Sequence, residues 1–421
     1  MVNDMYKKRQ PLLLYRVMNV IMMGYAFIML IRRMKQVIRN GQSFFSWDVT
    51  EFMINYQGGY VRRGFLGEIL YKINECFPAF DPRWAIFCVS LFCFFVFICF
   101  ILRKFKENDF CWWILPLNIC VSGAFSIVRK DYLCMLLVLF VLYSFNKIKI
   151  VGWRYLLLSV LLILSLNLHE CVFFIIGGFM LLAMYRDSDS KFGWRLWGIF
   201  SLIVTMGLVC MSKGNEEVAR QIWNSWGAFH SEFVDTHPAT SINAIGWNCV
   251  DTFQFHIREN FLISLYGVRL WFSKPLIWCF ILFVLPNIIF IRRGWQANRQ
   301  SMEVKRMLSI MLFQFASLLP MFTVLSCDGS RICFYWTISS MLIYFYMPAD
   351  KCMQIIPSIV QRIAAKIQKI VIFRNSVAWS LIVMLFLSIT TAGTNLYSFF
   401  SNSVVGVYFL IFYQGCMYLF A

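Results

Sequence analysis

YLLLSVLLILSLNLHECVFFIIGGFMLLAMY, residues 155–185, is a run of 31 positions in which the only charged or imidazole side chains are His169 and Glu170. A helix that crosses a membrane needs about 20 mostly apolar residues, so the run could form one long tilted helix or two shorter ones. Lysine and arginine residues flank it on both sides. Because such basic segments favour the cytoplasm, the chain crosses the membrane an even number of times between them. The run is therefore predicted to be a helical hairpin, with Asn167, His169 and Glu170 near its tip.

The composition of the whole chain places it among helical membrane proteins. Of its 421 residues, 60% are hydrophobic and 14% are charged, and the mean hydropathy is +0.66. A soluble domain carries about 25% charged residues and about 45–50% apolar ones. The sequence therefore excludes an ordinary soluble enzyme, a disordered chain and a secreted disulfide scaffold.

The basic charge balance indicates membrane anchoring. The chain has 39 lysines and arginines against 21 aspartates and glutamates, a formal net charge of +18. In a multi-span protein this excess anchors cytoplasmic loops and contacts anionic lipids, so membrane lipids are predicted partners and nucleic acid is not. The 15 cysteines lie mostly inside apolar runs without a C-x-x-C pair, which is typical of apolar packing and predicts no metal site.

The apolar runs predict a single integral membrane domain over 1–421, an all-α polytopic bundle of about eleven or twelve spans. The predicted spans are 11–31, 84–102, 111–128, 131–146, 155–168, 170–185, 196–212, about 260–291 (one or two elements), 307–326, 332–347, 377–394 and 403–420.

The basic segments between these spans predict the orientation of the chain. A cytoplasmic N-terminus follows, with a large first outer loop at about 32–83 and a second at about 213–259. Residues 351–370 have apolar positions at helical spacing with basic ones between them, which predicts one helix on the cytoplasmic membrane surface. The basic segments assigned to the cytoplasm are 7–9, 103–106, 147–154, 186–195, 292–306 and 351–374.

Two more hairpins are predicted by the same crossing argument, and their charged tips face the outer side. Residues 111–146 would place Arg129, Lys130 and Asp131 at a tip, and residues 307–347 would place Asp328 and Arg331 at another. Charges at membrane depth are usually kept for function. The alternatives are a solvated turn for the first tip and a local Asp–Arg ion pair around a glycine turn for the second.

The first outer loop contains SWDVTEFMINYQGGYVRRGFLGEI, residues 46–69. Asp48 and Glu51 share a face if this part is helical, and either carboxylate could act as a general base. Arg62 and Arg63 could hold phosphate oxygens bidentately, which suits a phosphorylated lipid substrate. We expect one of these arginines to lie near Asp48 and to lower its pKa. An interfacial loop with local ion pairs is the alternative.

The remaining signals concern proton transfer and sugar binding. His169 and Glu170 could move protons, but no H-E-x-x-H spacing accompanies them and no metal is predicted. The second outer loop, 213–259, combines tryptophans with carboxylates, a pairing suited to sugars, although a loop that only covers the site is the alternative. No Walker A, G-x-G-x-x-G or G-x-S-x-G pattern appears in its required context, so no nucleotide cofactor is predicted.

The run NYQGGYVRRGFLGE (55–68), followed by the arginine tip, the His-Glu tip and the D-G-x-R tip (328–331), resembles polytopic inner-membrane proteins of bacterial surface-polysaccharide clusters. The overall plan resembles O-antigen polymerases. An acidic residue in the first outer loop also resembles GT-C glycosyltransferases, where Asp48 would match the position of the catalytic carboxylate.

The resemblance implies a glycosyltransferase of the bacterial inner membrane that polymerises repeat units carried on undecaprenyl pyrophosphate. It implies Asp48, Glu51, His169 and Glu170 as catalytic candidates, and a chain-length regulator or other polysaccharide-assembly proteins as partners. Two alternatives stay open: a GT-C transferase that uses a polyprenyl-phosphate sugar, with a divalent cation allowed, and a lipid-linked glycan flippase. The cation and substrate-binding candidates are Arg62, Arg63, Arg129, Lys130, Asp131, Asp328 and Arg331.

Overall fold

The computed structural model describes residues 47–107, 128–227, 240–247, 297–321 and 329–368, together with positions 28, 250, 325, 408, 409, 411 and 412. Within these ranges every regular element is a helix and no strand is present, which confirms the all-α prediction for this part of the chain. The predicted spans 11–31, 111–128, 260–291, 377–394 and 403–420 fall almost wholly outside the described residues.

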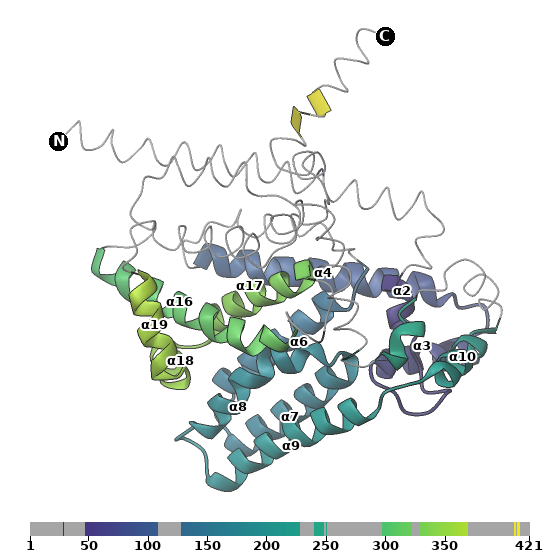
Figure 1. Cartoon of the computed structure of the whole chain (residues 1–421), viewed down its shortest axis with the longest axis horizontal. Helices are drawn as coiled ribbons and strands as arrows, with labels where there is room; N and C mark the ends of the chain where they lie inside the picture. The colour runs from purple at the N-terminus through teal and green to yellow at the C-terminus, as the bar shows by residue number, and fades with distance from the viewer. Residues whose placement is uncertain are drawn as a thin grey trace.

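The described helices gather into a bundle with smaller helices at both ends (Figure 1). Helices α2, α3 and α10 lie together at one end, and α18 and α19 lie at the other. In chain order the elements are α2 (Trp47–Phe52), α3 (Gly64–Cys76), α4 (Pro82–Glu107), α6 (Asp131–Lys147), α7 (Val151–Leu168), the π-helix η2 (Phe173–Gly177), α8 (Gly178–Tyr185), α9 (Phe192–Met211), α10 (Glu216–Ser225), the 3-10 helix η4 (Asn243–Gly246), α16 (Ala297–Pro320), α17 (Gly329–Tyr346), α18 (Ala349–Ile355) and α19 (Ser358–Gln368).

The long apolar run is broken where the sequence predicts a hairpin tip. Helix α7 ends at Leu168, and His169 has an extended backbone with φ −162° and ψ 122°. The chain turns at Glu170 and continues through η2 into α8, so two helices form instead of one. Helix α9 packs against both of them. Gly198 of α9 makes this possible, because a Cβ there would lie 2.6 Å from the sulfur of Met184 in α8.

The predicted hairpin over 307–347 is also present, although its first helix begins earlier. Helices α16 and α17 pack side by side, and the indole of Trp336 donates to the carbonyl of Met311 at 2.7 Å. Helix α16 starts at Ala297, ten residues before the predicted boundary. The early start is compatible with the polar sequence of the first turns, because helix formation depends on backbone bonding and not on an apolar sequence.

The single surface helix predicted over 351–370 is wrong in its continuity. The structure has two helices, α18 and α19, with Ile356 extended between them at φ −75° and ψ 131°. Pro357 explains the break, because a proline disfavours the helical conformation of the residue before it. Helix α19 packs against α16, while Ile359 and Ile363 remain exposed.

Two of the described helices, α7 and α9, are long and apolar enough to cross a membrane. Only 17% of the apolar window of α9 is buried inside the protein, which is unlike the core helix of a soluble domain. Its outward face carries Trp197, Phe200, Ile203 and Leu208, all of them exposed. An exposed apolar face of this kind marks an interaction surface. The full count of eleven or twelve spans and the orientation stay predictions.

Candidate functional site

The segments predicted as the two outer loops pack together into a small apolar core. Val49, Phe52 and Met53 around α2 contact Ile222 and Trp226 of the second loop. The indole of Trp226 donates to the carbonyl of Met53 at 2.9 Å, and the amide of Ser241 donates to the hydroxyl of Thr50 at 3.2 Å. The six-residue helix α2 is thus fixed by tertiary packing, which a helix this short requires. Packing of α2 on this core sets the positions of its two carboxylates, Asp48 and Glu51.

Helix α3 approaches the end of α2 so closely that only glycine fits at residue 67. A Cβ on Gly67 would lie 1.8 Å from the carbonyl oxygen of Ile54. In the same segment Gly59 has φ +108°, a conformation that favours glycine. The glycines of the 55–68 run therefore have structural roles in shaping this loop.

We expect Gly67→Ala to lower the free energy of unfolding by about 2 kcal/mol or more, because backbone must move to relieve the overlap. Gly207→Ala in α9 is the matched control, since a Cβ there meets nothing within 4 Å. An alanine within an open helical position is neutral or stabilising by about 1 kcal/mol. Thermal unfolding of the detergent-solubilised protein compares the two, and equal midpoints would contradict the close approach.

Arg63 lies at the centre of the charged cluster. Its backbone has φ 67° and ψ 1°, a left-handed conformation that is costly for a residue with a Cβ. Its Nε donates to both oxygens of Glu170, at 3.0 and 2.8 Å, and its Nη2 also contacts Glu170. Its Nη1 lies 3.5 Å from Glu51. These contacts, with Glu170 at 107 positions away and Glu51 at 12, accompany the strained backbone conformation of Arg63.

Lys130 supports this conformation from the tip that precedes α6. The side chain is fully buried, and its ammonium donates to the carbonyl of Arg63 at 3.0 Å. Its Nζ also lies 5.6 Å from the centre of the Phe52 ring. Burial lowers the pKa of Lys130 to about 8. Lys130 is therefore a positioning residue for Arg63 in this structure.

Glu51 is the most enclosed carboxylate of the cluster, with no exposed surface. Three groups converge on its Oε1: Arg63 and Arg331, each at 3.5 Å, and the Nε2 of His169 at 3.1 Å. The His169 Nδ1 accepts a hydrogen bond from the backbone amide of Cys171 at 3.2 Å, and its Nε2 also lies 3.4 Å from Nη2 of Arg331. Burial alone would raise the pKa of Glu51, but Arg331, His169 and Arg63 together hold it well below its usual range.

Asp48 pairs with Arg129 and not with the arginines of its own loop. The Nε of Arg129 donates to Oδ1 of Asp48, and the two side chains are 12% and 15% exposed. The expectation that Arg62 or Arg63 would lower the pKa of Asp48 is therefore wrong. Burial raises its pKa, Glu51 adds to this shift, and Arg129 opposes it without cancelling it. A raised pKa makes Asp48 a better proton acceptor than an ordinary aspartate.

Arg331 joins the cluster from the start of α17. Its Nε donates to Oδ1 of Asp131 at 2.7 Å, and the hydroxyl of Tyr335 donates to the same oxygen. The described partners of Arg331 include Glu51 on α2, Asp131 on α6 and His169 after α7, and the predicted local pair with Asp328 stays a prediction. Asp328 itself lies outside the described residues. Tyr335 was missed by the sequence analysis, although its place one helical turn after Arg331 puts the two on one face.

Among the four arginines of the cluster, Arg62 is held least tightly by carboxylates. Its Nη1 lies 3.7 Å from Glu170, and its Nη2 donates to the carbonyl of Trp247 at 2.9 Å and, at 3.4 Å, to that of Ile245. Its backbone amide donates to Ser212 at 2.9 Å. The second loop thus supplies main-chain carbonyls to the cluster, and its described carboxylates Glu216 and Glu217 are instead exposed at the start of α10.

The cluster collects every described site candidate from chain segments far apart in sequence. It contains four carboxylates and five cations, so its formal charge is +1 when His169 is neutral. A net positive, largely enclosed cluster can stabilise an anion and can hold one of its carboxylates as a base. The members are Asp48, Glu51, Asp131 and Glu170 with Arg62, Arg63, Arg129, Lys130 and Arg331.

No family model, curated protein or solved structure matches this chain. Among the described residues, no group of three histidine, cysteine, aspartate or glutamate side chains is arranged to hold a metal ion.

Proposed function

We propose that the chain is a membrane-embedded glycosyltransferase that joins sugars carried on a polyprenyl phosphate lipid. The specific reaction we propose is O-antigen polymerisation on undecaprenyl-pyrophosphate-linked repeat units at the periplasmic face of a bacterial inner membrane. The observation that carries this proposal is the convergence of Asp48, with its raised pKa, and five cations in one cluster. Keeping so many charges together is costly, and such clusters are kept where chemistry needs them.

The proposed reaction needs a base and an anion site. A hydroxyl of one lipid-linked oligosaccharide attacks the anomeric carbon of a second chain, and the bond from that carbon to the pyrophosphate oxygen breaks. Asp48 accepts the hydroxyl proton, and the pyrophosphate leaves with the bonding electrons. Cations near the leaving group offset the charge that develops on it. In this proposal Asp48 is the base, and the cations of the net positive cluster form the anion site.

The contacts divide the arginines into two roles. Arg63 is occupied by Glu170 and Glu51, which suits a residue that orders the site. Arg62 has only one weak carboxylate contact, and its other described side-chain partners are neutral carbonyls. A phosphate would be a stronger partner than a carbonyl, because both groups of that pair are charged. We therefore assign first contact with the leaving phosphate to Arg62.

The glycan phenotype of a gene deletion tests the proposal in the strain that carries the gene. A polymerase predicts lipopolysaccharide with a single repeat unit and no ladder, restored by the wild-type gene. A normal ladder with complete repeat units would contradict any role in glycan assembly. The Gly207→Ala protein is a suitable expression control, because its exposed helical position is distant from the cluster in sequence and has open space at Cβ.

The second candidate is a GT-C transferase that adds one sugar from a polyprenyl phosphate. The position of Asp48 on a short helix of the first predicted outer loop favours it, because this is the position that the GT-C resemblance implies. A ladder that lacks one branch sugar in the deletion strain would support this candidate over the polymerase. Movement of a lipid-linked glycan across reconstituted vesicles without a change in its length would instead support a flippase.

A further inference from the structure

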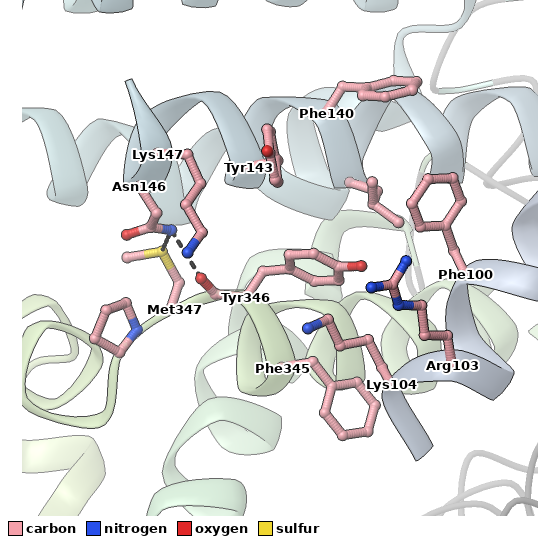
Figure 2. Close-up of a pocket in the computed structure, with 12 residues that line it drawn as sticks. Phe100, Arg103, Lys104, Phe140, Tyr143, Asn146, Lys147, Phe345, Tyr346 and Met347 are labelled. Atoms are coloured by element: carbon pink, nitrogen blue, oxygen red, sulfur yellow. Dashed lines mark hydrogen bonds between the residues drawn. The ribbon is translucent and has the colours of Figure 1, made fainter. Parts of the chain in front are cut away.

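A second charged feature lies at the other end of α6 from the candidate site. A cavity of about 620 Å³ is bounded by the last turns of α4, α6 and α17. Figure 2 shows the ring of Tyr346 inside it, with Lys147 on one side and Arg103 and Lys104 on the other. Lys104 lies with its Nζ 5.3 Å from the centre of that ring. The volume falls within the range of about 300–1,000 Å³ that is usual for small-ligand sites.

The charges of this cavity are of one sign. Among the described residues that line it, three are cations and none is a carboxylate. The cationic members are Arg103, Lys104 and Lys147, and the cavity also contains the hydroxyl of Tyr143 and the amide of Asn146. Cations gathered around a concave surface favour an anion there, because their fields add while the protein walls exclude water.

The cations are not required as caps for the end of α17. Lysine and arginine near a helix C-terminus often serve its last carbonyls. Here Asn146 donates to the carbonyl of Tyr346 at 2.9 Å, and Arg306 donates to those of Tyr344 and Met347, both at 2.6 Å. The last carbonyls of α17 therefore have described partners other than the three cations of the cavity.

The walls of the cavity combine this charge with apolar surface. Phe140 and Tyr143 of α6 are 42% and 49% exposed, and Phe100 of α4 is 36% exposed. Lys147 precedes the start of α7 by only a few residues, and the first turns of α7 and α9 carry exposed Trp153 and Trp194. Tryptophans at helix ends are typical of the membrane–water boundary. A headgroup phosphate at the cations and acyl chains along the exposed rings would match these walls.

We propose that this cavity binds the phosphate of an anionic phospholipid, with its acyl chains along Phe100 and Phe140. Arg103, Lys104 and Lys147 contact the phosphate oxygens, and the aromatic side chains contact the lipid tail. The shared chemistry, a phosphate group between three cations, would also suit free phosphate. The exposed aromatic surface favours the lipid, because a free phosphate has no apolar part that could contact these rings. This site is independent of the proposed glycosyltransferase activity.

Binding to the purified full-length protein in a neutral detergent tests the proposal. Labelled phosphatidylglycerol should bind saturably, and unlabelled phosphatidylglycerol should displace it, whereas phosphatidylcholine and inorganic phosphate should not at the same concentrations. The variant Arg103→Gln/Lys104→Gln/Lys147→Gln should bind on the order of 100-fold more weakly, since each of the three lost cations near a lipid surface contributes roughly 1 kcal/mol. The single Lys147→Gln change, at an exposed residue, should weaken binding about fivefold even if the triple variant does not fold.

The matched control removes three exposed basic residues outside the cavity: Lys191→Gln/Arg362→Gln/Lys366→Gln. It changes the net charge equally and should keep wild-type affinity. Equal losses in the control would show general charge attraction and overturn the site. Displacement by inorganic phosphate as effective as that by phosphatidylglycerol would overturn the lipid assignment. Unchanged affinity of Lys147→Gln would also count against the proposal.

Discussion

Glu51→Gln should destabilise the protein by about 3–5 kcal/mol, the cost expected when one partner of a buried ion-pair network is removed. Glutamine has nearly the same shape as glutamate, so little packing is lost. The charge is lost, however, and Glu51 is the group on which Arg63, Arg331 and His169 converge. Arg331 retains Asp131 and Arg63 retains Glu170, but the enclosed space among them would then have excess positive charge.

Thermal unfolding of the solubilised protein measures this effect, with a fall in midpoint of about 5 °C or more expected. Glu217→Gln is the matched control, because Glu217 pairs with Arg220 on exposed α10 at 3.7 Å. An exposed pair contributes about 0–1 kcal/mol, so the control should be nearly neutral. Similar midpoints for the two variants would mean that Glu51 does not hold the cluster together.

The sequence could predict that the charged residues of the three hairpin tips lie close together, because the number of membrane crossings places all three tips on one side. Arg129, His169, Glu170 and Arg331 all interrupt or end apolar runs, and charges there have few places to lie. The structure brings their side chains together with the first outer loop. Span number and sidedness depend partly on residues that the structure does not describe, so they stay predictions.

The pairing within the cluster could not be predicted from sequence. Asp48 contacts Arg129, 81 positions away, and Glu170 contacts Arg63, 107 positions away. Nothing in a linear pattern distinguishes these pairs from Asp48 with Arg63. The choice is made by the small core under α2, which orients its carboxylates, and by the left-handed backbone of Arg63, which redirects its side chain.

The basic cavity also could not be predicted from the sequence. Arg103, Lys104 and Lys147 were interpreted only as cytoplasmic anchors, which any basic loop would satisfy. Their gathering depends on α4, α6 and α17 ending at one level. The helix ends meet because of tertiary packing, and the sequence of any one helix does not indicate where its neighbours end.

Asp48→Asn should lower the rate of glycan assembly by about 10²–10⁴-fold, the usual contribution of a general base. The change preserves the shape of the side chain and removes its ability to accept a proton from an attacking hydroxyl. The structure removes an objection to this role, since Arg129 is its partner and burial raises its pKa overall. Assembly by the purified protein with lipid-linked oligosaccharide, after its folding is checked by thermal unfolding, measures the loss.

The pH dependence separates a base from a merely structural carboxylate. If Asp48 is the base, the rate falls as pH drops through its raised pKa, so the acid limb lies above the ordinary value of 3.8. Arg129 favours the charged carboxylate, and Arg129→Gln should therefore move this limb to still higher pH. If Asp48 has only a structural role, Arg129→Gln can lower the rate but leaves the acid limb of the pH–rate profile at the wild-type pH. An Asp48→Asn protein that folds normally and builds glycan at the wild-type rate would exclude Asp48, and His169 and Glu170 would then be the residues to replace.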